Sequence, residues 1–205
     1  MAIATVDWRA FCGRHSRLFG FLVTLKRMRT KAAILLLLVC LAEQVYFSQA
    51  PFCLEKPNIW VALGLLLIGA GSVARLAALG SIRKKMRLAT TGIYSICRHP
   101  LYLGSMLIAF GFCILLRDVS TYVIAAGYFV IFYPLTIVWE ECRLRERYGD
   151  EHHAYCRSVP LLLPLGLLHW SPISVRRALN HGGFSLLAGE CLMLAVVEVM
   201  AKTLH

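Results

Sequence analysis

TTGIYSICRHPLYLG, residues 90–104, is the stretch of sequence from which the fold can be worked out. A second polar stretch, WEECRLRERYGDEHHAYCRSVP at residues 139–160, has the same character. Both lie directly beside long apolar runs. Side chains able to do chemistry are therefore concentrated where apolar segments end, which predicts a functional site where a membrane meets water.

The composition indicates an integral membrane protein. The chain has 205 residues, the length of one domain, and is 59% hydrophobic but only 16% charged. Soluble domains are about one quarter charged. A chain this short cannot bury the apolar excess in an enlarged core, so the excess is expected to face lipid. We therefore predict an all-α integral membrane protein.

The net charge of +11 points to the bilayer as a partner and not to nucleic acid. A soluble protein with this charge would be a candidate nucleic-acid binder. Here the basic residues form short clusters beside apolar runs, at residues 26–31 and 83–87. Topology signals and contact with anionic lipid headgroups explain that pattern better.

The cysteines indicate neither a metal site nor a disulfide framework. There are eight, none in a C-x-x-C pair, whereas a zinc site needs paired ligands at fixed spacing. We expect buried free thiols and no metal.

The apolar runs predict about five transmembrane helices, at residues 32–47, 59–79, 101–116, 119–139 and 184–200. A bilayer core of roughly 30 Å takes about 20 residues of helix. We divide the chain into a basic amphipathic segment (1–30), a membrane core (31–168) and a C-terminal extension with a further membrane helix (169–205).

The charge of the connections predicts the topology. Basic residues gather in the N-terminal segment, the 80–99 loop and the 140–180 segment, whereas the turns at 48–58 and 117–118 are nearly neutral. The positive-inside rule then places both motif stretches on the cytoplasmic side. The membrane would be a plasma or inner membrane, or that of the endoplasmic reticulum.

The run Arg98 to Tyr102 places a cation, an imidazole, a rigid turn and an aromatic ring at the start of a predicted helix. Proline restricts the backbone of the preceding His99, so the His99 and Tyr102 side chains could both face a pocket. The alternative interpretation is a basic residue that reaches the interface beside a belt tyrosine.

Glu140 and Glu141 follow directly on a predicted span. Adjacent helix positions point about 100° apart, so one carboxylate can face a pocket while the other pairs with Arg145. A carboxylate at the membrane edge suits a cationic ligand. The alternative is a solvated start of a helix.

Together these residues resemble a known family. The pattern G-x-Y-x-x-x-R-H-P-x-Y-x-G at 92–104 is similar to the isoprenylcysteine carboxyl methyltransferases and their phospholipid methyltransferase relatives. So is E-E followed by R-Y-G-D-E-x-x-x-Y and V-P, between 140 and 160. The resemblance covers about residues 65–165. It implies a cytoplasmic-side pocket for S-adenosyl-L-methionine, built from the last core spans and the polar segment after them.

The resemblance also implies site residues. The family's catalytic positions fall on Arg98, His99 and Glu141, and its cofactor contacts fall on Leu88, Ala89, Tyr94, His99, Pro100, Leu101, Tyr102 and Glu140. Methyl transfer is an in-line displacement that depends on alignment. Aromatic faces favour a sulfonium, and a carboxylate favours the cofactor's ammonium group.

The acceptor side departs from the family pattern. Four residues before Glu140, the carboxyl methyltransferases tend to carry an arginine, where this chain has Thr136. Arg143 or Arg75 would have to substitute as a substrate contact. The acceptor therefore stays open between an isoprenylcysteine carboxylate, a phospholipid amine and a related lipid.

Two other interpretations remain. One is an NADPH-dependent membrane reductase of the sterol-reductase type, which Tyr155-Cys156 before Val159-Pro160 resembles. Paired carboxylates argue against it, because NADPH phosphates favour arginines. The other is a non-catalytic membrane protein on this scaffold, suggested by Thr136 and by Met86, where the family often has histidine.

Overall fold

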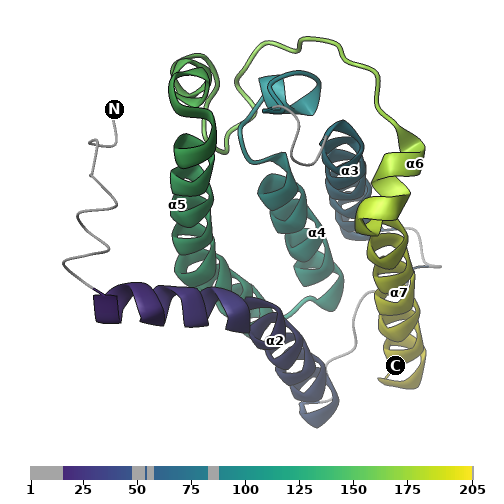
Figure 1. Ribbon diagram of the computed structural model, residues 1–205. Coiled ribbons are helices and arrows are strands. Elements are labelled where there is room, and N and C mark those ends of the chain that lie inside the picture. Colours follow the sequence, from purple (N-terminus) through teal and green to yellow (C-terminus); the bar gives the residue numbers. More distant parts are fainter. Residues whose placement is uncertain (1–15, 48–53, 55–57, 83–87, 205) are drawn as a thin grey trace.

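The computed structural model describes residues 16–47, 54, 58–82 and 88–204. Along the chain the helices are α2 (Ser16–Tyr46), α3 (Ile59–Ser81), η1 (Ile93–Ser95), α4 (Pro100–Leu116), α5 (Val119–Ser158), α6 (Val175–Ala178), η2 (Leu179–Gly183) and α7 (Phe184–Leu204). The long helices form one bundle in which α4 lies between α3 and α5 (Figure 1). Nothing in the described residues forms a strand beyond a single bridge between Gly92 and His169.

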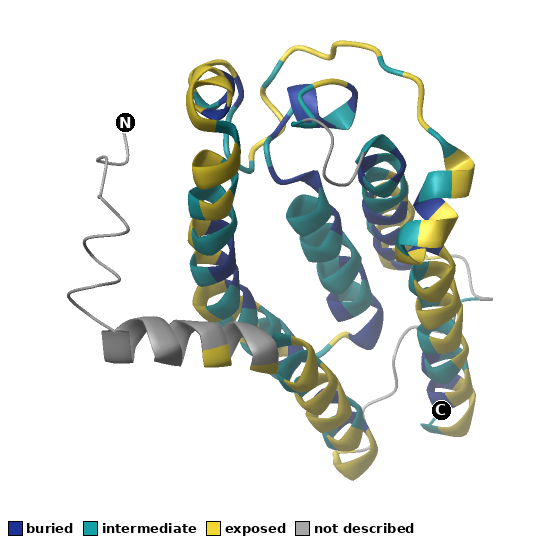
Figure 2. Cartoon of the chain, in the orientation of Figure 1, coloured by how far each residue is buried: buried dark blue, intermediate teal, exposed yellow. Residues whose placement is uncertain are grey.

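The all-α membrane fold is confirmed. Three helices are long and apolar enough to cross a membrane, namely Ile59–Ser81, Val119–Ser158 and the continuous helix Val175–Leu204, and Pro100–Leu116 is a shorter apolar helix. Exposed residues cover the outer faces of these helices (Figure 2), and many are large and apolar, such as Leu66, Val130 and Leu192. Lipid is the solvent that suits such a surface.

In the N-terminal part of the chain, the structure has one helix where the sequence predicted an amphipathic segment followed by a separate span. Residues 32–46 of the stretch 32–47, which was predicted as a separate span, form the second half of α2, which is one continuous helix from Ser16. Of the predicted amphipathic segment, residues 1–15 lie outside the described residues, and 16–30 are the first half of the same helix. A sequence without proline or glycine between 21 and 47 offers no stop signal.

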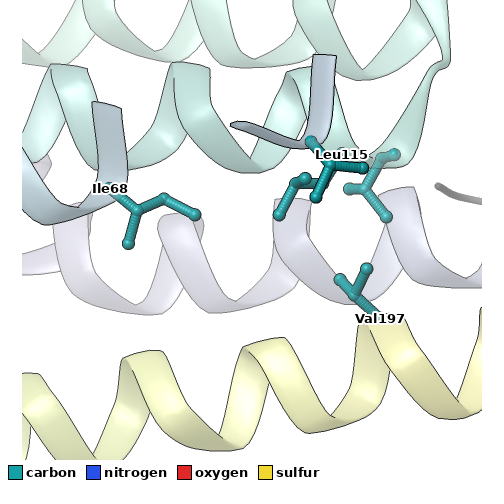
Figure 3. Close-up of a cluster of buried hydrophobic side chains, with 5 residues drawn as sticks. Ile68, Leu115 and Val197 are labelled. Atoms are coloured by element: carbon teal, nitrogen blue, oxygen red, sulfur yellow. The ribbon is translucent and has the colours of Figure 1, made fainter. Parts of the chain in front are cut away.

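Glycines allow α3 and α4 to lie backbone to backbone. A Cβ atom on Gly71 would lie 2.5 Å from the carbonyl oxygen of Gly104, and one on Gly111 would lie 2.7 Å from that of Gly64. Small residues permit this close approach between membrane helices. Beside this contact, Ile68, Leu115 and Val197 belong to a buried cluster that joins α3, α4 and α7 (Figure 3).

Helix α5 joins an apolar part to a polar extension that contains Glu140 and Glu141. Up to the break at Gly149 the helix would extend roughly 45 Å, which is longer than the roughly 30 Å thickness of a bilayer core. Residues 119–139 are its apolar part and 140–158 its polar extension, which is broken at Gly149 by φ 49° and ψ −120°. The tight turn before α5, at Arg117 and Asp118, makes α4 and α5 an antiparallel hairpin.

The segment after α5 returns to the first motif. In Figure 1 it passes over the end of the bundle where η1 lies. The amides of Arg98 and His99 donate to the carbonyls of Pro160 and Leu161 at 2.9 and 3.2 Å, and the amide of Gly166 donates to that of Ile96 at 2.9 Å. Residues 161–168 therefore form an irregular strap with exposed leucines.

Candidate active site

The Arg98–His99 turn is held in place at the start of α4. His99 is the N-cap residue of this helix and Pro100 occupies its first turn, where a missing amide hydrogen costs nothing. The backbone bonds to the strap fix the turn from the other side. As a result the His99 side chain is directed inward and is only 4% exposed.

Glu141 is the centre of a charge network made of Arg98, His99, Glu141 and His152. Nε2 of His99 lies 2.8 Å from Oε1 of Glu141, and the Arg98 guanidinium donates to Oε2. Nε2 of His152, which is buried, lies 3.7 Å from Oε2. The ion pair with Arg145 that the sequence suggested is thus replaced by one with Arg98, because the turn packs directly against α5.

The electrostatics keep Glu141 ionised. Burial raises the pKa of this carboxyl, but hydrogen bonds from His152 and His99 and the charge of Arg98 outweigh it, so the pKa lies below its usual range. An anionic Glu141 can only accept hydrogen bonds. Nε2 of His99 therefore carries a proton, and Nδ1 of a neutral His99 carries the free lone pair.

Glu140 faces a different direction and is 43% exposed. The hydroxyl of Tyr102 donates to its Oε2 at 2.8 Å, and Nδ1 of His99 lies 3.9 Å from the same oxygen. The ring of Tyr102 packs edge-on against Tyr133, with centroids 5.1 Å apart. The result is a half-open carboxylate bordered by an aromatic ring and an imidazole.

Tyr94, in η1, lies just before the Arg98–His99 turn and is hydrogen-bonded to α5. Its side chain is buried, and burial raises its pKa. The hydroxyl of Tyr155 on α5 donates to its carbonyl oxygen at 2.6 Å. Tyr155, which belongs to the Tyr155-Cys156 pair that suggested a reductase, thus joins α5 to η1.

A family model described as phospholipid methyltransferase matches residues 59–151. This segment contains α3, α4 and most of α5, including both Glu140 and the Arg98–His99 turn. Over these residues the chain is similar to the phospholipid methyltransferase family. Arg98, His99, Tyr102, Glu140 and Glu141 therefore lie within the matched segment, whereas His152 and the strap lie outside it.

The curated relatives fall into two groups, metal resistance proteins and isoprenylcysteine O-methyltransferases. Over 115 residues the chain is 31% identical to the nickel-cobalt-cadmium resistance protein NccN of Alcaligenes xylosoxydans xylosoxydans, covering 52% of this chain and 53% of that protein. It is 33% identical over 106 residues to the cobalt-zinc-cadmium resistance protein CzcN of Cupriavidus metallidurans, covering 51% and 49%. The chain thus spans about half the length of these two relatives.

It is also 27% identical over 146 residues to protein-S-isoprenylcysteine O-methyltransferase B of Arabidopsis thaliana, covering 65% of this chain and 72% of that protein. No solved structure matches.

The structure gathers five predicted site residues of the matched segment at one place: Arg98, His99, Tyr102, Glu140 and Glu141. The other predicted cofactor contacts are close in sequence to Arg98, His99 and Tyr102. Leu88 and Ala89 lie half-buried in the loop before them, and Pro100 and Leu101 form the first turn of α4. Their contact with a cofactor stays a prediction.

The predicted substrate residues lie apart from one another. Thr136 is 2% exposed and its hydroxyl donates to the carbonyl of Phe132, in its own helix. The Arg143 guanidinium lies over the ring of Trp139, 5.3 Å from its centroid. The Arg75 guanidinium donates to Ser105 inside the bundle. A substrate role for each stays a prediction.

Sequence reasoning did not single out His152. The ligand atoms of Glu141, His152 and Cys156 lie within 4.8 Å of one another, an arrangement that could hold a metal ion. However, Arg98 donates to Glu141 and also to Sγ of Cys156, at 2.9 Å. A cationic side chain therefore already occupies the position that a metal would take, and the absence of a metal site stays a prediction.

Proposed function

We propose that the protein is a membrane-embedded, S-adenosyl-L-methionine-dependent methyltransferase that acts on a lipophilic acceptor at the cytoplasmic face. One observation carries the proposal: Glu140, half-open to solvent, lies beside the ring of Tyr102 and the imidazole of His99 at the end of the apolar bundle. The similarity of residues 59–151 to the phospholipid methyltransferase family supports the same reaction type.

The residues present fit the cofactor's chemical groups. Glu140 has a carboxylate suited to an ammonium group, and the Tyr102 ring offers a face suited to a sulfonium. Bound S-adenosyl-L-methionine supplies an electrophilic methyl group on sulfur. Glu141 contributes indirectly, because its bonds to Arg98 and His99 hold the turn in one orientation. Such positioning can contribute several kcal/mol to an in-line displacement.

His99 has a defined role for an acceptor that must lose a proton. The anionic Glu141 keeps the proton on Nε2, so Nδ1 is the atom that would receive a proton. It lies on the side of Glu140. A carboxylate acceptor is already anionic and would need no base.

The geometry supports this reaction over NADPH reduction. Arg98 is paired with Glu141 and with Cys156, so its charge is already compensated. Phosphate groups of NADPH would require an arginine able to donate to them.

The test is direct binding of S-adenosyl-L-methionine and NADPH to the detergent-purified full chain. We expect S-adenosyl-L-methionine to bind and NADPH not to bind. Glu140→Gln should weaken binding about tenfold or more, because a charge-assisted bond is lost. Glu151→Gln, the same change at an exposed position of α5, is the matched control. Absence of S-adenosyl-L-methionine binding would overturn the proposal, and transfer of labelled methyl groups to a membrane-lipid extract would identify the acceptor.

A further inference from the structure

An apolar cavity of about 600 Å³ lies among α2, α3, α4, α5 and α7. Aliphatic and aromatic side chains form most of its wall, including Leu37, Ile108, Phe112, Phe129 and Met193. A cavity of this size suits a ligand the size of a drug molecule, which corresponds to one lipid chain and not to a two-chain phospholipid. None of the residues proposed above to bind the cofactor lines it.

Three polar side chains line this cavity near the same end of the bundle. Arg75 lies six residues before the end of α3, Ser105 five residues after the start of α4, and Glu190 six residues after the start of α7. At 1.5 Å per residue Arg75 and Ser105 are roughly 8–9 Å below the helix ends that lie on the side of the Arg98–His99 turn, and Glu190 lies at the level of Ser72 on α3, from which it accepts a hydrogen bond. The cavity therefore has a charged end near the candidate active site, whereas Leu116 and Cys40 lie at its other end.

The charged end contains two unused hydrogen-bonding atoms. Nε of Arg75 and Oε1 of Glu190 are buried and have no hydrogen-bond partner in the described part of the chain. Other atoms of both groups have partners: Nη1 of Arg75 donates to Ser105, and Oε2 of Glu190 accepts from Ser72 at 2.7 Å. Buried polar atoms are rarely left without a partner, so the donor and the acceptor point to a ligand.

These two atoms define the chemistry of the occupant. Nε of Arg75 needs an acceptor and Oε1 of Glu190 needs a donor, and their charges cancel. A carboxylate headgroup would satisfy Arg75 but be repelled by Glu190, and an ammonium group would do the reverse. An uncharged hydroxyl satisfies both, since its oxygen accepts while its hydrogen is donated.

We propose that the cavity binds a single-chain lipid alcohol, with its chain along the apolar wall and its hydroxyl between Arg75 and Glu190. The proposal goes beyond the methyltransferase function, because it concerns binding alone and holds whether or not the bound lipid receives a methyl group. The neutral balance of the two charges makes the site selective by headgroup.

The test uses three probes with the same 16-carbon chain: hexadecanol, hexadecanoate and hexadecylammonium. Each competes with labelled hexadecanol for the detergent-purified full chain, without S-adenosyl-L-methionine. We expect hexadecanol to bind at least tenfold more tightly than either charged probe. Equal binding of all three would indicate unselective chain occupancy and overturn the proposal, as would the absence of binding.

Charge variants give a readout that loss of packing would not produce. Glu190→Gln leaves Arg75 uncompensated, so hexadecanoate should become the preferred probe. Arg75→Gln leaves Glu190 uncompensated, so hexadecylammonium should be preferred. An unchanged order of preference in both variants would mean that the headgroup lies elsewhere.

A steric pair tests the location of the chain. Gly189 lines the cavity and Gly127 does not, and a Cβ atom on either would meet nothing within 4 Å. Gly189→Leu should abolish hexadecanol binding, while Gly127→Leu should leave it intact. S-adenosyl-L-methionine binding, measured on both variants, reports folding and tests the proposed function separately.

Discussion

Nε2 of His99 lies 2.8 Å from Oε1 of Glu141, although 42 positions separate the two residues. This bond joins the start of α4 to the point where α5 leaves its apolar part. The same carboxylate receives the Arg98 guanidinium, so one side chain fixes two consecutive residues of the turn. The orientation of the candidate site therefore depends on Glu141 more than on any other described side chain.

Removing the charge of Glu141 should loosen this turn. In Glu141→Gln the partly buried Arg98 loses its ion pair, and we expect about 2 kcal/mol lower unfolding free energy. Thermal unfolding in detergent measures the effect, and S-adenosyl-L-methionine affinity should fall with it. Glu151→Gln, on the exposed face of the same helix, should change neither value. A Glu141→Gln variant as stable as the original chain would contradict a central role for this carboxylate.

The stabilisation from Glu141 should disappear in acid. Although burial raises its pKa, hydrogen bonds from His152 and His99 and the Arg98 charge lower it overall, below the ordinary value of 4.5. In the unfolded chain Glu141 therefore takes up its proton at higher pH than in the folded chain. Its contribution is complete above about pH 4.5 and is lost progressively below that pH. The difference in thermal midpoint between the original chain and Glu141→Gln, measured from pH 7 to pH 3.5, should shrink; a constant difference would argue against an ionised Glu141.

Cys156 should be slow to react with alkylating reagents at neutral pH. Burial raises the pKa of its thiol to about 11, and the nearby Glu141 charge adds to this. Because only the thiolate is nucleophilic, we expect Glu141→Gln to shift the alkylation profile to lower pH, as measured by mass spectrometry. Cys97, which is buried by other residues and whose pKa is also raised to about 11, should keep its profile. A parallel shift at Cys97 would indicate general loosening instead.

Close packing of α3 on α4 should make Gly104 intolerant of a side chain. A Cβ atom there would lie 2.7 Å from the carbonyl oxygen of Gly71, so Gly104→Ala forces the helices apart and should cost about 1–3 kcal/mol. The matched control is Gly69→Ala, where the added carbon meets nothing within 4 Å. Unfolding midpoints in one detergent compare the two. Equal midpoints would show that this contact does not limit stability.

The membrane fold and the convergence of Arg98, His99, Tyr102, Glu140 and Glu141 could be predicted from the sequence. Apolar run lengths indicate helices, and the family resemblance identifies the polar positions between them. The partner of Glu141 could not be predicted in this way. Local spacing favoured Arg145 on the same helix, whereas the actual ion pair depends on how the turn before α4 packs against α5.

The charged end of the cavity was beyond sequence reasoning for a similar reason. Arg75 and Glu190 lie on helices far apart in the chain, and Glu190 lies outside the region of family resemblance. Glu190 could be recognised as an ionisable residue that faces a protein interior. Its neighbours Ser72 and Arg75 follow only from the packing of α7 beside α3.

The strap after α5 is fastened to the first motif by main-chain hydrogen bonds at Arg98, His99 and Gly166. Main-chain bonds place few demands on side-chain identity, apart from Gly166, where a Cβ atom would lie 2.1 Å from the carbonyl oxygen of Ser95. The leucines that the strap exposes are therefore not needed for these main-chain bonds. Exchanging these leucines should therefore change how this end of the bundle associates with lipid, while the candidate site keeps its main-chain support.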